Sequence, residues 1–93
     1  MSSRDEAYDV AWQALPRGEQ GGGLVWEPLS CIGGDLLETE IGDSGLRTSF
    51  YQFQCETCVR GSAGTGRAVD EVTVYKKSGD VSRRAVSTEE ALC

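Results

Sequence analysis

Two periodicities of apolar residues run along the chain, and together they predict one helix followed by several strands. In the first sixteen residues the apolar side chains recur at intervals of three and four, the spacing of one helix face: Tyr8, Ala11, Trp12 and Leu15. Ser3 and Glu6 form a capping box before this pattern, and Pro16 ends it. The pattern therefore predicts an N-terminal helix.

After a glycine-rich connection, apolar and polar residues alternate with the period of two that is typical of strands. Such segments lie at 24–26, 36–41, 46–55 and 68–76, with a further short one at 81–86. The segment 46–55 has aromatic residues on both faces, which predicts a central strand covered on both sides. Ser87 and Glu90 form a second capping box, which predicts a brief helix through Leu92.

The predicted fold class is α+β: an N-terminal helix packed on an antiparallel sheet of about four strands, with a short C-terminal helix. Ninety-three residues are too few to divide, so residues 1–93 are expected to form a single domain. No segment approaches the length of an apolar membrane span, and the first residues lack the apolar core of a secretory signal. A cytoplasmic location is therefore expected.

The formal net charge of −6 is unevenly distributed along the chain. Residues 1–58 hold ten acids and three bases, whereas residues 59–93 hold five acids and six bases. A protein that binds nucleic acid needs a basic stripe that neutralises phosphates, and the bases here form only isolated pairs. The charge argues against direct nucleic-acid binding and favours a protein partner with a basic surface.

The stretch from Gly61 to Gly66 has the glycine spacing of a phosphate-binding P-loop but lacks the chemistry of one. The lysine and the Ser/Thr that should follow are replaced by Arg67 and Ala68, and the next residues alternate as a strand where a helix is required. A nucleotide site is therefore not expected, and the stretch is interpreted as a hairpin connection.

The cysteines are the clearest candidates for chemistry. Cys55 and Cys58 form a C-x-x-C pair. Upstream, Cys31 could begin a second such pair, but Gly34 occupies the position of its second cysteine. The stretch 31–58 resembles a zinc ribbon that lacks one ligand. This resemblance implies a structural or transcription-associated module with a possible zinc ion, for which Cys93 would complete the ligand set Cys31, Cys55, Cys58 and Cys93. The alternatives are a redox-active Cys55–Cys58 disulfide and free thiols packed as small apolar side chains.

The sequence does not contain the residues of a usual nucleophilic active site, because the chain has no histidine to activate a serine or cysteine nucleophile. We therefore expect a non-enzymatic protein-binding module, an inhibitor or adaptor that occupies the basic surface of a partner such as nucleic-acid-handling machinery. The candidate partner-binding residues are the acids around the predicted hairpin: Asp35, Glu38, Glu40, Asp43 and Glu56. In size and charge the chain is similar to small acidic inhibitors encoded by phages, anti-CRISPR proteins among them.

Overall fold

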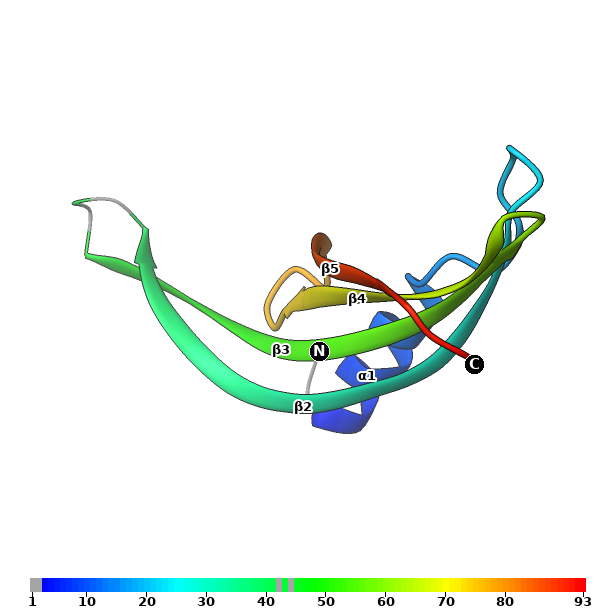
Figure 1. Ribbon diagram of the computed structural model, residues 1–93. Helices are drawn as coiled ribbons and strands as arrows, with labels where there is room; N and C mark the ends of the chain where they lie inside the picture. Colours follow the sequence, from blue (N-terminus) through cyan, green and yellow to red (C-terminus); the bar gives the residue numbers. More distant parts are fainter. Residues whose placement is uncertain (1–2, 42, 44) are drawn as a thin grey trace.

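The computed structural model describes residues 3–41, 43 and 45–93. In that part of the chain, one helix precedes an antiparallel sheet of five strands in the spatial order β1-β2-β3-β4-β5 (Figure 1). The elements are α1 (Arg4–Gln13), β1 (Gly18–Glu19), β2 (Val25–Ile41), β3 (Leu46–Gly61), β4 (Gly64–Tyr75) and β5 (Val81–Glu90). Each strand pairs with the one that follows it in sequence, and β2 and β3 bend along their whole length (Figure 1).

The predicted N-terminal helix is confirmed. Ser3 caps α1, because its hydroxyl oxygen accepts a hydrogen bond from the backbone N–H of Glu6 at 3.2 Å. Ala7, Ala11 and Leu15 follow one another at intervals of four residues and are buried. These three side chains are the contribution of the helical segment to the core.

The core lies between α1 and one face of the sheet, which we call the helix face; the opposite face is the open face. Alternate residues of β3 and β4 point toward α1 and complete the core: Tyr51, Phe53, Cys55, Val72 and Val74. Phe53 is 1% exposed. The ring of Tyr8 packs edge-on against it at 6.1 Å, and the guanidinium of Arg4 lies 5.7 Å from its ring centroid.

The strand predicted at 46–55 is central, as expected, but the prediction that both its faces are covered is wrong. Only the helix face is covered by a helix within the described residues, so Phe50, which points to the open face, stays half-buried. The predicted glycine hairpin is confirmed, since β3 ends at Gly61 and β4 begins at Gly64.

The two strands predicted at 24–26 and 36–41 merge into one long strand, β2, which begins one residue later, at Val25. Its register with β3 shifts twice, between Pro28 and Ser30 and between Gly33 and Asp35. These β-bulges absorb the proline and glycine signals that interrupt the alternating pattern. The strand therefore continues through residues that favour a break.

The predicted C-terminal helix is wrong, and this corrects the predicted α+β fold: the described residues form one short N-terminal helix and an antiparallel sheet of five strands, close to the four expected. Residues 81–90 form β5, which pairs with β4 from Val81 to Glu90. A helix of about six residues is too short to be stable by itself, so the backbone hydrogen bonds offered by β4 outweigh the capping box. The described chain is mostly sheet, with one short helix.

Candidate functional site

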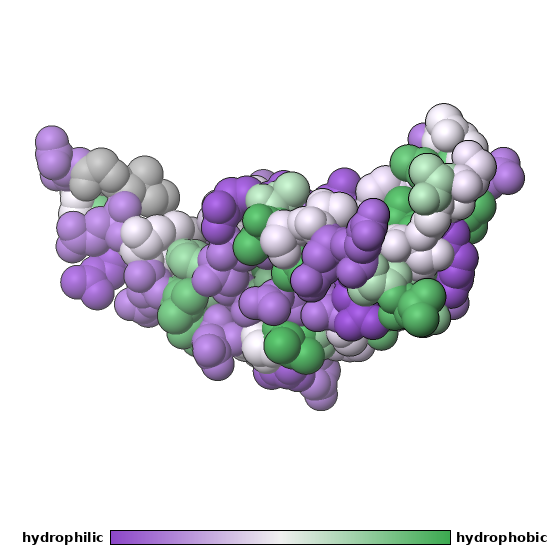
Figure 2. All heavy atoms as spheres, in the orientation of Figure 1, coloured by the Kyte–Doolittle hydropathy of each residue, from purple (hydrophilic) through white to green (hydrophobic). Residues whose placement is uncertain are grey.

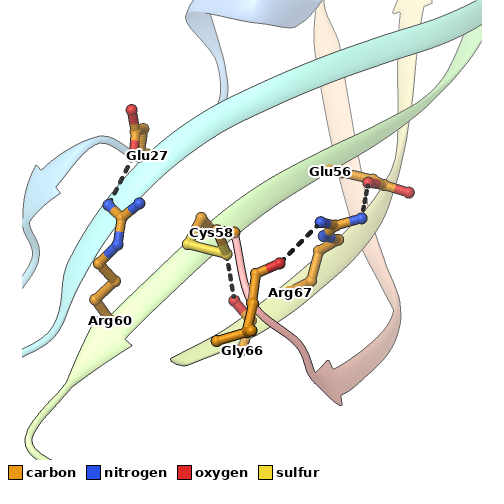
Figure 3. Close-up of a disulfide and its surroundings, with 8 residues drawn as sticks. Glu27, Glu56, Cys58, Arg60, Gly66 and Arg67 are labelled. Atoms are coloured by element: carbon orange, nitrogen blue, oxygen red, sulfur yellow. Dashed lines mark hydrogen bonds and ion pairs between the residues drawn. A yellow bond between two sulfur atoms is a disulfide. The ribbon is translucent and has the colours of Figure 1, made fainter. Parts of the chain in front are cut away.

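The four cysteines, all among the described residues, are joined in two disulfides. Cys31 lies directly opposite Cys55 in the register of β2 and β3, with a Cα–Cα distance of 4.0 Å. Cys58, which is fully buried on the open face of β3, is bonded to Cys93 with a Cα–Cα distance of 5.9 Å. The second bridge therefore ties the end of the chain to the middle of the sheet (Figure 3).

These pairings correct the cysteine chemistry expected from the sequence. Cys31 and Cys55 use their sulfur atoms on one side of the sheet and Cys58 and Cys93 on the other, so the four cannot surround one ion. Among the described residues no group of three or more cysteine or acidic side chains could hold a metal. The alternative Cys55–Cys58 bridge is also wrong, because residues three positions apart in a strand point to opposite faces. The alternative of free thiols is wrong because all four cysteines are in disulfides.

Ion pairs flank the Cys58–Cys93 bridge on the open face (Figure 3). Glu27 and Arg60 approach to 2.7 Å, and Glu56 lies 3.4 Å from Arg67. Arg67 also donates a hydrogen bond to the carbonyl oxygen of Leu92 at 3.2 Å. Glu56, a predicted partner-binding residue, is thus half-buried and engaged within the fold.

The β2–β3 hairpin extends beyond the rest of the sheet. Tyr75, the last residue of β4, lies opposite Phe50, so residues 38–41 of β2 and 46–49 of β3 have no third strand beside them within the described part of the chain. We call these two segments and Asp43 the arm; it is the projection at the left of Figure 1. Such a projection can be contacted from both of its sides at once.

Acidic side chains occupy one side of the arm and its turn. Glu40 lies directly opposite Arg47 across the hairpin at 3.7 Å, and Glu38 reaches the same guanidinium at 3.6 Å. Both pairs are more than half exposed, and such pairs contribute little to stability. Asp43 is exposed in the turn. One arginine therefore pairs with two of the three acids, and the three acids and one base leave the arm with a net negative charge.

Leucines in the arm and at its base are exposed to solvent. Leu46 is 65% exposed and Leu37, at the base of the arm, is 40% exposed; the register places both on the open face. Leu36 is 48% exposed on the other side. Figure 2 shows a hydrophilic surface over most of the arm, with hydrophobic residues near the body of the sheet. Exposed apolar side chains among acids are typical of a surface that a partner covers.

An open hollow of about 730 Å³ lies at the base of the arm on the open face. The rings of Phe50 and Tyr75, 6.1 Å apart and tilted by 58°, belong to its lining. The other lining residues are polar or acidic: Thr39, Glu40, Thr48, Gln52, Thr73, Ser78 and Asp80. Aromatic faces beside carboxylates suit a lysine or arginine side chain, which gains both ion-pair and cation–π energy.

The fold brings together part of the predicted acidic cluster. Glu38, Glu40 and Asp43 share the arm, whereas Asp35 lies outside it, opposite Gln52 on the open face, and Glu56 lies near the second disulfide. The sequence did not indicate the hollow, because a strand at 46–55 covered on both sides would bury Phe50. The aromatic residues on both faces of one strand were the available signal, because a sheet covered on one side must expose some of them.

Comparison of the chain with protein-family models, with curated protein sequences and with solved structures finds no match. Across the described ranges, no helix is long and apolar enough to cross a membrane.

Proposed function

We propose that the protein binds, through its arm, a partner protein that exposes lysine and arginine side chains, and that it acts as an inhibitor or adaptor without chemistry of its own. The observation that carries the proposal is the projecting arm, whose acids remain exposed beyond the end of β4, with exposed leucines in the arm and at its base. The hollow at the base of the arm adds two aromatic rings and Asp80, which makes no ion pair within the described residues. A basic groove would meet acids on one side of the arm and the hollow on the other.

The two disulfides support an oxidising compartment as the place of action, in contrast to the cytoplasm expected from the sequence. A partner in that compartment, with basic residues on its surface, fits the arm better than cytoplasmic nucleic-acid machinery. Thiol labelling of protein from intact producing cells tests this point. Labelling of all four cysteines before any reductant is added would contradict it.

Nuclear magnetic resonance titration with a basic probe tests the arm. The probe is a peptide of alternating arginine and glycine, and its control has glutamine at each arginine. Arginine peptide should shift the amide resonances of arm residues and of Phe50 and Tyr75, and glutamine peptide should not. Reversal of two acids, Glu38→Lys with Glu40→Lys, should weaken binding by at least about tenfold, because two attractions become repulsions.

A matched variant separates the arm from net charge. Glu89→Lys with Glu90→Lys makes the same change in net charge on β5, away from the arm. It should leave the arginine-peptide affinity within about twofold of wild type, since surface charges separated by more than about 10 Å are largely screened at 0.1 M salt. Equal loss in the two variants, or resonance shifts scattered over the surface, would show that the arm is not the binding site.

A further inference from the structure

β5 forms one edge of the sheet, and all ten of its residues are exposed. It pairs with β4 and lies beside it (Figure 1). No strand within the described part of the chain pairs with its outer edge, where backbone N–H and C=O groups can accept another strand. Natural proteins commonly protect such an edge with charges that repel a second strand. The charges on β5 have a different arrangement.

The order of charges along β5 is self-complementary. Arg83 and Arg84 lie near its start and are followed, after four uncharged residues, by Glu89 and Glu90. When two copies of the strand run antiparallel, Arg83 can lie opposite Glu90 of the second copy and Arg84 opposite Glu89. The two-fold axis repeats both pairs, so one register forms four pairs of opposite charge.

A β-bulge places the members of each pair on the same face of the sheet. The register with β4 skips Val86, so the alternation of side chains between the two faces shifts by one residue at that point. Arg83 and Glu90 consequently lie on the helix face, and Arg84 and Glu89 lie on the open face. In a regular strand, residues seven or five positions apart point to opposite faces, and neither pair could form.

The side chains required for this pairing are accessible. Glu89 and Glu90 make no ion pair within the described ranges, although each is exposed. Arg83 and Arg84 approach acids of β4, at 3.8 Å and 3.2 Å, but their side chains remain 40% and 69% exposed. A guanidinium has five N–H donors, so each arginine can donate to a second carboxylate, including Arg83, which also donates to the carbonyl oxygen of Ala14 at 3.4 Å.

The same register also covers an apolar side chain that the single chain leaves exposed. Val86, 53% exposed, would lie beside the two-fold axis. Its burial removes apolar surface from water and favours association.

We propose that the chain associates with a second copy of itself through β5, antiparallel about an axis between Val86 and Ser87, so that the two sheets become one. The interface shares no residue with the arm, so this proposal and the arm proposal can fail separately. Two paired strands form an interface at the small end of the range, and we expect a dissociation constant between about 10 μM and about 1 mM.

Sedimentation of the full, disulfide-bonded chain across that concentration range tests the proposal. The mass should rise from 10.0 kDa toward twice that value. Glu89→Lys with Glu90→Lys should weaken association about 30-fold, since four cross-strand attractions become repulsions. This variant removes no ion pair seen in the structure, and Glu38→Lys with Glu40→Lys, of equal net charge, should dimerise as wild type does.

A mixing experiment tests the register itself. Arg83→Glu with Arg84→Glu makes β5 wholly acidic, and Glu89→Lys with Glu90→Lys makes it wholly basic. Each variant alone should be monomeric, and an equimolar mixture should form a heterodimer although both chains remain net negative. A monomeric wild type at about 1 mM, a dimer that tolerates the Glu89 and Glu90 reversal, or two folded variants that stay apart would each overturn the proposal. If the arginine variant does not fold, the glutamate variant alone decides.

Discussion

Loss of the Cys58–Cys93 disulfide should remove much of the stability of this protein. The bridge joins residues 35 positions apart, and a covalent ring of that size lowers the entropy of the unfolded chain by an amount worth about 4 kcal/mol at 25 °C. Cys58 is fully buried, so its replacement by alanine also leaves a small cavity, at about 1 kcal/mol. Against a total stability of about 5–15 kcal/mol for a domain, the combined loss is large.

The assay is urea unfolding of Cys58→Ala with Cys93→Ala beside wild type, both under oxidising conditions. The midpoint should fall by an amount corresponding to about 4–5 kcal/mol, because the ring-closure and cavity contributions add. Hydrogen exchange should quicken first in the last residues of β5, since the bridge holds the chain that follows them.

The matched control is Cys31→Ala with Cys55→Ala, which opens a ring of 24 residues. Ring size predicts about 3.5 kcal/mol for it, and the loss of two buried core sulfur atoms adds to that value. A loss below about 1 kcal/mol in the Cys58 and Cys93 variant, with the disulfide of the wild type verified by mass, would refute the chain-entropy argument.

Substitutions at Gly34 and at Ser3 test two local features, the close approach of β2 to the ring of Phe53 and the N-cap of α1. Gly34→Ala should lower the free energy of unfolding by about 3 kcal/mol, because Gly34 has φ +87° and a Cβ there would lie 2.5 Å from the ring of Phe53. The control Gly45→Ala, at φ +74° with no atom within 4 Å of the added Cβ, should lower it by only about 1 kcal/mol. Equal losses in urea unfolding would contradict the steric argument. Ser3→Ala should cost about 1 kcal/mol and reduce helical circular dichroism, whereas Ser3→Asp should retain most of both, since it can accept the same hydrogen bond from Glu6.

Local sequence signals were sufficient to predict an element where contacts with residues distant in the sequence do not favour a different structure. The helix at α1 followed from its capping box and its apolar spacing, and the hairpin after Gly61 followed from glycine between two alternating segments. Both are decided within about a dozen neighbouring residues. The acidic character of residues 35–43 also followed from the sequence, because charge does not depend on the fold.

Tertiary structure decided the remainder. The capping box at Ser87 was overridden by β4, whose edge offers the terminal segment hydrogen bonds over ten residues. Pro28 and Gly34 did not break β2, because bulges absorb them while β3 continues to pair. The cysteine partners depended on which face of which strand each cysteine occupies, and spacing along the chain cannot reveal that. Strand pairing joins residues far apart in sequence, so its outcome depends on the whole sheet and not on any one segment.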